Sequence, residues 1–195
     1  MPTETVKTQA ATAPASWLKT YYFLRFAISA LWVALAFTLA KTMPPIAAVM
    51  LVAYPAWDAL ANVIDAGRSG GLRRNPSQML NVAVSLLTAI AVVVALGRGI
   101  SSVITVFGVW AALSGLFQLL TGARRWKTAG AQWAMILSGA QSALAGFFFV
   151  KMAHGTAPLG IVTVAPYAAF GAFYFLVSAL WLVVSDARRK TALSS

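Results

Sequence analysis

The chain has 195 residues and contains no cysteine; 60% of the residues are hydrophobic, 10% are charged, and the mean hydropathy is +0.78. A soluble domain is about 45–50% apolar and about 25% charged, and a soluble core of this size cannot bury the excess, so the sequence predicts an integral membrane protein. The net charge of +11 would suggest nucleic acid in a soluble chain, but here the basic residues are confined to short stretches outside the apolar runs, which excludes that interpretation.

The first 16 residues are polar and have no apolar centre, so they do not resemble a cleaved signal peptide. We expect a disordered cytoplasmic tail over 1–16 and a membrane domain over 17–190. A short cytoplasmic tail is expected over 191–195. The apolar segment after the first tail is of full length and is expected to remain as the first span.

Six apolar segments are long enough to span a membrane, which takes about 20 residues of helix. Open backbone finds no hydrogen-bond partners in hydrocarbon, so each segment must be a helix. The predicted fold class is therefore an all-α integral membrane protein with six transmembrane helices. The predicted spans are 18–40, 44–66, 77–97, 100–122, 130–150 and 159–184.

Lysine and arginine are divided unequally between the two ends of these spans. Twelve fall on one side: Lys7, Lys19, Arg25, Arg68, Arg73, Arg74, Arg124, Arg125, Lys127, Arg188, Arg189 and Lys190. Three fall on the other side: Lys41, Arg98 and Lys151. Cytoplasmic loops carry the excess of basic residues, so the first side is predicted to be cytoplasmic, with both termini inside. Anionic lipid headgroups are the expected partners of these loops, and nucleic acid is not.

The first two helix pairs align with each other without a gap. The alignment matches Leu24 with Leu80, Ser29 with Ser85, Asp58 with Ser114 and Asn62 with Gln118. A fainter third copy matches SGLFQLLTGARR (114–125) with SALWLVVSDARR (178–189), and Ser138 with Ser85. Each copy is a helix pair that enters from the same side. The sequence thus predicts three parallel helical-hairpin repeats, over about 18–66, 77–122 and 130–184.

The second repeat closes with GVWAALSGLFQLLTGARRWK. With six spans in three short hairpin repeats, the chain resembles the HdeD-like acid-resistance membrane proteins, a bacterial group that carries a short repeat of unknown function. The resemblance covers roughly residues 20–190. It implies a multi-pass protein of the inner membrane with a role in acid or envelope stress. It supplies no catalytic residues, and none are carried over.

Polar residues interrupt the second span, in the stretch YPAWDALANVIDAG (54–67). Asp58, Asn62 and Asp65 share one face of a helix at this spacing. If the first two spans are antiparallel, Asp58 lies at the depth of Arg25, and Asp65 lies at the depth of Lys19. Asp58 and Arg25 then lie roughly 12 Å inside the boundary, where a lone charge costs at least ~2.5–3.5 kcal/mol. We therefore predict the ion pairs Arg25–Asp58 and Lys19–Asp65.

Two interpretations of this polar cluster stay open. In the first, the two ion pairs fasten the first hairpin and fix its register. In the second, Asp58 is the site of a small transporter or of a proton or cation channel, because charged side chains inside spans are functional candidates. A transport site usually recurs between repeats, whereas Asp58 corresponds to Ser114 in the second copy, and this favours the first interpretation.

Few other residues are candidates for chemistry. His154 is the only histidine and is expected in an outer loop, as a sensor of external acid or as a solvated loop residue. One histidine without cysteine or a nearby carboxylate does not make a metal site, and no metal or cofactor is expected. The chain has no HExxH motif and no Ser/His/Asp set with credible geometry. We expect a non-enzymatic protein.

Small and uncharged polar residues in the later spans also have two interpretations. Gln118 and Gln141 either line a polar interior or form hydrogen bonds between helices. Ser138, Ser142 and Gly146 follow each other at four-residue spacing, which lets helices approach closely. The close approach occurs either inside the monomer or at a dimer face, so a homo-oligomer stays open.

Overall fold

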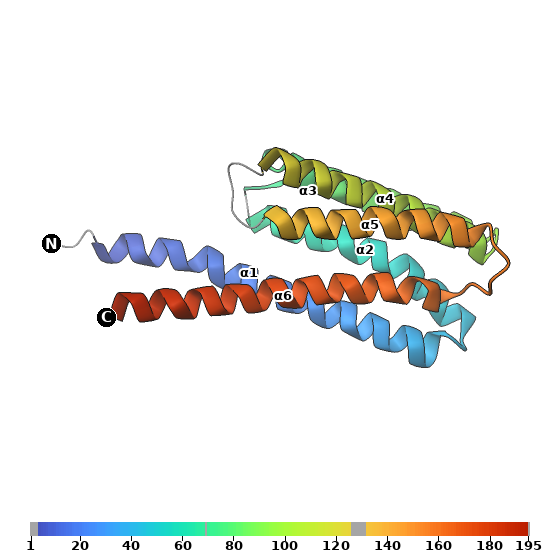
Figure 1. Ribbon diagram of the computed structural model, residues 1–195, viewed down its shortest axis with the longest axis horizontal. Coiled ribbons are helices and arrows are strands. Elements are labelled where there is room, and N and C mark those ends of the chain that lie inside the picture. The colour runs from blue at the N-terminus through green and yellow to red at the C-terminus, as the bar shows by residue number, and fades with distance from the viewer. Residues whose placement is uncertain (1–3, 69, 126–131, 195) are drawn as a thin grey trace. The chain divides into compact units, whose positions relative to one another are not determined.

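A computed structural model describes residues 4–68, 70–125 and 132–194 of the chain. Within these ranges the protein forms six long α-helices and two short helical segments, with no strand (Figure 1). The elements are α1 (Glu4–Leu35), η1 (Ala36–Ala40), α2 (Pro44–Arg68), η2 (Leu72–Arg74), α3 (Pro76–Leu96), α4 (Ile100–Arg125), α5 (Gln132–Ala153) and α6 (Ile161–Ser194). Segment η1 is a π-helix and η2 is a 3₁₀-helix.

All six described α-helices are long and apolar enough to cross a membrane, which confirms the prediction of six spans. Their apolar lengths are Trp17–Ala40, Pro44–Arg68, Pro76–Leu96, Ile100–Leu120, Ile136–Ala153 and Ile161–Arg189. Prolines mark two of the predicted starts, because α2 begins at Pro44 and α3 begins at Pro76. Proline is tolerated in the first turn, where its missing N–H would have no helical partner.

The two terminal helices are longer than their predicted spans. Helix α1 begins at Glu4, where the sequence analysis expected a disordered tail over 1–16, and α6 continues to Ser194. A helix that already exists grows by one hydrogen bond for each added residue, without a new nucleation cost. Both helices therefore continue beyond the residues that are apolar enough to span.

The chain is divided into two compact units. The first unit comprises Met1–Val33 and Ala168–Ser195, and so contains most of α1 and of α6. The second unit comprises Ala34–Tyr167, and contains η1, α2 to α5 and the first residues of α6.

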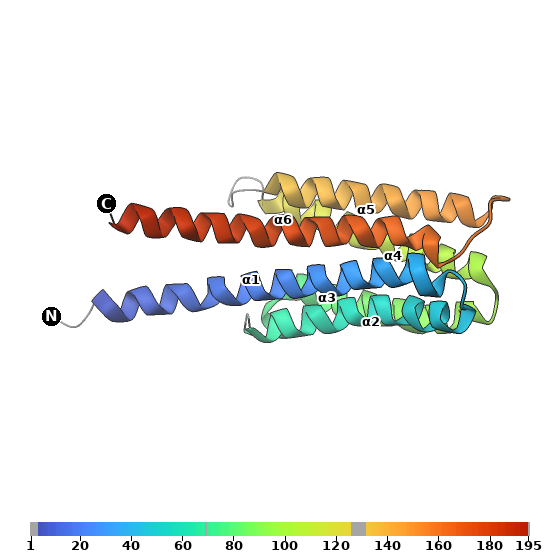
Figure 2. The same cartoon turned by 90° about the horizontal axis from the view of Figure 1, so that it is seen from below.

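In the first unit α1 and α6 lie side by side and antiparallel (Figures 1 and 2). The ring of Tyr22 stacks on that of Phe175, with centroids 6.4 Å apart. The Glu4 end of α1 and the Ser194 end of α6 lie at the same end of this unit.

In the second unit α2 packs against α3, α3 against α4, and α4 against α5. The α4–α5 contact is the tightest, because glycines face the opposite backbone. A Cβ added to Gly115 would lie 2.5 Å from the carbonyl oxygen of Gly139. A Cβ added to Gly146 would lie 2.5 Å from the carbonyl oxygen of Gly108. The sequence analysis expected close approach from Gly146 and the two serines, and here it occurs inside the monomer.

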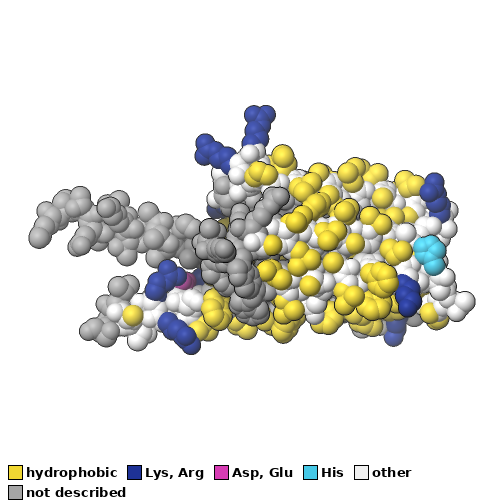
Figure 3. All heavy atoms as spheres, turned by 45° about the horizontal axis from the view of Figure 1, so that its top comes forward, with side chains coloured by type: hydrophobic (Ala, Val, Ile, Leu, Met, Phe, Trp, Pro, Cys, Tyr) yellow, Lys and Arg dark blue, Asp and Glu magenta, His cyan; other side chains and the backbone are white. Residues whose placement is uncertain are grey.

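The outward surface of the second unit is apolar along the helices. Hydrophobic side chains cover the visible face in Figure 3, and Lys, Arg and His154 appear near its ends. On α3, Leu87 is 65% exposed and Ile90 is 62% exposed. Such exposure suits a helix in a bilayer, because lipid tails are as apolar as leucine.

Candidate intramembrane polar site

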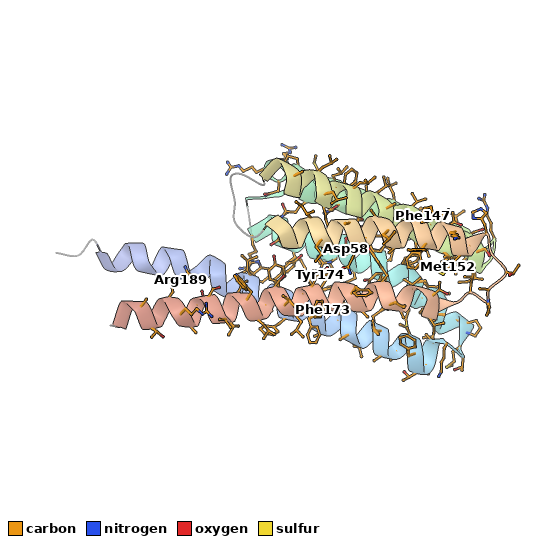
Figure 4. All side chains as sticks on the ribbon, viewed as in Figure 1. Asp58, Phe147, Met152, Phe173, Tyr174 and Arg189 are labelled. Carbon is orange, nitrogen blue, oxygen red and sulfur yellow. The ribbon has the colours of Figure 1, made fainter. Side chains whose placement is uncertain are left out.

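Asp58 lies part-way along α2 (Figure 4) and receives hydrogen bonds from two side chains. Ser85 Oγ of α3 donates to Asp58 Oδ2 at 2.9 Å. Asn62 Nδ2, one turn further along α2, donates to the same carboxylate oxygen at 3.2 Å and to the carbonyl oxygen of Asp58 at 2.8 Å. The carboxylate is thus joined to the neighbouring helix and to its own helix.

Trp110 of α4 extends this arrangement to a third helix. Its Nε1 donates to Ser85 Oγ at 3.1 Å. An indole N–H is a donor only and a serine has one hydroxyl proton, so the direction of each bond is set: Trp110 donates to Ser85, and Ser85 donates to Asp58. Ser85 is 1% exposed and Trp110 is 5% exposed. We call Trp110, Ser85 and Asp58 the Asp58 chain.

Aromatic rings surround the indole of Trp110. The ring of Tyr54 on α2 lies 5.7 Å away at 90°, that of Phe107 lies 5.8 Å away at 82°, and that of Tyr167 on α6 lies 6.0 Å away at 71°. These are edge-to-face contacts, which aromatic pairs prefer over face-to-face stacking. They hold the indole in the orientation that directs its N–H at Ser85.

A second polar contact fastens α4 to α5. Ser142 Oγ donates to the carbonyl oxygen of Ala111 at 2.8 Å and lies 3.0 Å from the hydroxyl of Tyr167. Because the single proton of Ser142 points at Ala111, Tyr167 is the donor in the other bond. Ser142 therefore links α4, α5 and the start of α6.

Asp65 lies two turns beyond Asp58 on α2, and its partner is also on α3. Gln78 Nε2 donates to Asp65 Oδ2 at 2.6 Å. The pairs Asp65–Gln78 and Asp58–Ser85 are placed symmetrically about the loop between α2 and α3, as antiparallel helices require.

The charged residues of the first unit have partners of their own. Lys19 Nζ lies 2.7 Å from Asp186 Oδ2, and Arg189 Nη2 lies 2.8 Å from Asp186 Oδ1. Arg25 Nη1 donates to the hydroxyl of Tyr21 at 3.2 Å. The guanidinium carbon of Arg25 lies 4.2 Å from the ring centroid of Phe175, a cation–π contact.

The structure therefore joins some members of the predicted cluster and gives others partners that were not foreseen. Asp58 and Asn62 are bonded, as their helical spacing indicated. Lys19 binds Asp186, and Asp65 accepts from Gln78. The predicted pairs Arg25–Asp58 and Lys19–Asp65 would each join one unit to the other, and they remain predictions.

Sequence reasoning missed Ser85, Gln78 and Trp110 as members of the site. A signal for the first two was present: the equal-depth argument that was applied to the first hairpin also holds for α2 and α3, and it pairs Asp58 with Ser85 and Asp65 with Gln78. Trp110 had no such signal, because its role depends on where the indole nitrogen points.

The second repeat contains an uncharged counterpart of the contact between α2 and α3. Ser138 Oγ of α5 lies 3.5 Å from Gln118 Oε1 of α4, at the limit of a hydrogen bond. In the predicted repeat alignment Gln118 matches Asn62, and Ser138 matches Ser85. The equivalent helix pair is thus closed by neutral groups alone.

His154 lies just beyond the last residue of α5 and is exposed. Its Nδ1 is 2.8 Å from the carbonyl oxygen of Val150, so Nε2 is directed elsewhere. Across the described part of the chain, no three His, Asp or Glu side chains gather where they could hold a metal ion.

The match with a known family covers α3, α4 and most of α5. Residues 83–151 match the family model of the short repeat of unknown function (DUF308). The match spans roughly a third of the chain and includes Ser85, Trp110 and the glycines of the α4–α5 contact, but not Asp58. No curated protein and no solved structure matches the chain. Together with the six apolar helices, this describes a multi-pass membrane protein with a stretch similar to that repeat.

Proposed function

We propose that the protein is a non-enzymatic protein of the bacterial inner membrane that acts in acid or envelope stress homeostasis. The observation that carries the proposal is the short-repeat match over 83–151, because it falls within the region that resembles the HdeD-like proteins. Anionic headgroups are the proposed counterions of the exposed Arg68, Arg73 and Arg74 at the inner end of α2.

A deletion strain tests this function. Survival after transfer to acidic medium is expected to fall in the strain that lacks the protein, and to recover when the wild-type chain is restored. His154→Gln serves as a matched variant, because His154 lies at the C-terminal end of α5, where protonation adds a favourable charge. Equal survival with and without the protein, under both acid and envelope stress, would remove the proposed role. Full rescue by His154→Gln would leave His154 as a solvated loop residue.

A second candidate function is the passage of a proton or a cation at Asp58. The observation in its favour is the neutral contact between Gln118 and Ser138, which shows that an equivalent helix pair packs without a carboxylate. The charge of Asp58 therefore exceeds what helix pairing requires, and charged groups inside a membrane are costly to keep.

Purified protein in liposomes distinguishes the two functions. A pH-sensitive dye inside the liposomes is expected to report an intact proton gradient if the protein has a homeostatic role without ion passage. Collapse of the gradient with the wild-type chain, and its preservation with Asp58→Asn, would instead establish proton passage at Asp58. The control is Ser114→Ala, at the position of the second repeat that matches Asp58.

A further inference from the structure

We propose that Asp58 reversibly binds a proton rather than a metal cation, and that Ser85 and Trp110 are positioning residues that set its proton affinity. This inference rests on the second candidate function, because it specifies the ligand and the regulation of the same site. Its basis is the directed hydrogen-bond chain from Trp110 through Ser85 to Asp58 across three helices.

The groups around Asp58 suit a proton and not a cation. A bound cation needs several oxygen ligands that turn lone pairs toward it. Here Asn62 presents its NH₂ group to Asp58, and Ser85 presents its hydroxyl proton. The indole N–H of Trp110 occupies a lone pair of Ser85 Oγ. A proton needs none of these ligands, since it binds directly to a carboxylate oxygen.

Protonation of Asp58 is a single, balanced step. One proton adds to a carboxylate oxygen, an O–H bond forms, and the negative charge disappears. The new hydroxyl group is a donor, whereas the surrounding bonds from Asn62 and Ser85 need an acceptor. Protonation therefore weakens the bond between α2 and α3 that Asp58 accepts from Ser85.

Few ionisable groups surround Asp58 in the second unit. The faces of α3 and α4 that reach the Asp58 chain contribute Ser85 and Trp110, which do not ionise in this range. On α2 itself, Tyr54 lies one turn before Asp58, and Asp65 lies two turns after it in a hydrogen bond with Gln78. The predicted counterion on α1 is Arg25. The orientation of the Ser85 hydroxyl is thus a principal control on the charge of Asp58 within this unit.

Infrared difference spectroscopy of the purified protein during a pH titration is the direct test. The chain has four carboxylic side chains, Glu4, Asp58, Asp65 and Asp186, so the C=O band of a protonated acid can be assigned by substitution. We expect a titrating band that disappears in Asp58→Asn. In Ser85→Ala the charged form loses a donor, so the midpoint is expected to rise by about one pH unit, a tenfold change in proton affinity.

Three further variants separate positioning from folding. Trp110→Phe keeps an aromatic ring but leaves the Ser85 hydroxyl undirected, and is expected to move the midpoint in the same direction by less. Ser85→Cys retains a weak donor of similar size, and is expected to give an intermediate midpoint. Ser138→Ala removes the equivalent serine of the second repeat, and is expected to leave the midpoint unchanged.

The outcomes divide cleanly. A band that persists in Asp58→Asn overturns the proton site. A midpoint that is the same in wild type, Ser85→Ala, Ser85→Cys and Trp110→Phe overturns the positioning role. If the midpoints shift as expected while the liposomes hold their gradient, the proton site stands and passage through the membrane fails.

Discussion

At the scale of single residues, polar side chains in the spans are matched donor to acceptor. Asp58 accepts from Ser85, Asp65 accepts from Gln78, and Ser142 donates to the backbone of α4. Hydrogen bonds between membrane helices contribute on average only about 0.6 kcal/mol, because the unfolded chain in a membrane also finds partners. Their main effect here is to select which helix faces which.

The predicted pair Arg25–Asp58 can be tested by a double-mutant cycle. Arg25→Ala and Asp58→Ala are each expected to lower the melting temperature in detergent, because each leaves a charge without its counterion, at a penalty of about 3–5 kcal/mol in a buried setting. The double alanine variant is expected to recover part of that loss. The charge swap, Arg25→Asp with Asp58→Arg, is expected to recover more.

The same cycle distinguishes an ion pair from a proton site. Asp58→Asn keeps the shape of the side chain, so under the proton-site interpretation it folds nearly as well as wild type and loses the pH-dependent behaviour. Strictly additive losses in the two alanine variants would mean that Arg25 and Asp58 do not interact, and that the equal-depth argument fails for the first hairpin.

At the scale of elements, the α4–α5 pair depends on the absence of side chains. Gly108 faces Gly146, and Gly115 faces Gly139, with backbone atoms of one helix in the space where a Cβ of the other would stand. Close backbone approach increases van der Waals contact, which replaces the hydrophobic effect as the force that joins helices in lipid. Ser142 adds a hydrogen bond between these two helices.

Substitutions of these glycines test the contact. Gly115→Ala and Gly146→Ala are each expected to lower the free energy of unfolding by about 1–3 kcal/mol, because the added methyl group meets backbone that cannot give way. Thermal unfolding in detergent measures the change.

Gly67→Ala is the matched control, since Gly67 also lies in a helix but has no atom within 4 Å of an added Cβ. It is expected to be neutral or to stabilise by about 0.4–1 kcal/mol. Equal effects at Gly67 and at Gly115 would show that helix propensity, and not close packing, explains the glycines.

At the scale of the whole molecule, the distribution of basic residues and the connection of the six helices agree with one orientation. Consecutive spans alternate in direction, so each loop alternates between the two sides of the membrane. The loop before α3 contains Arg73 and Arg74, whereas the turn before α2 contains Lys41 and the turn before α4 contains Arg98. In the first unit, the described ends of α1 and α6 lie at the same end.

Cysteine labelling tests the predicted orientation, since the natural chain has no cysteine. The loops at 67–76 and 123–129 are predicted to be cytoplasmic, and so Ser69→Cys and Thr128→Cys, both outside the described residues, are expected to resist a membrane-impermeant maleimide added to intact cells. Thr42→Cys and Thr156→Cys, which are exposed positions at the opposite ends of the spans, are expected to react. Labelling of the first pair and protection of the second would reverse the orientation.

The sequence by itself determined the number and approximate positions of the six spans. The physical reason is that hydrocarbon accepts only backbone that is bonded within its own segment, so a long apolar run must be a helix wherever its neighbours lie. The positions of Pro44, Pro76 and the basic loops are local features of the chain and needed no tertiary information. The spacing of Asp58 and Asn62 on one helix face was likewise readable from helical geometry alone.

Only the tertiary structure decided which helix each polar side chain meets. Three faces of a helix can turn toward three different neighbours, and the order of spans in the chain does not say which neighbour a face receives. Asp58 bonds to Ser85 on α3, and Lys19 pairs with Asp186 on the last helix, far away in sequence. The direction of the Trp110 N–H and the backbone contact of Gly115 with Gly139 depend on helix rotation and approach, which packing sets to within an ångström and a hydropathy pattern does not encode.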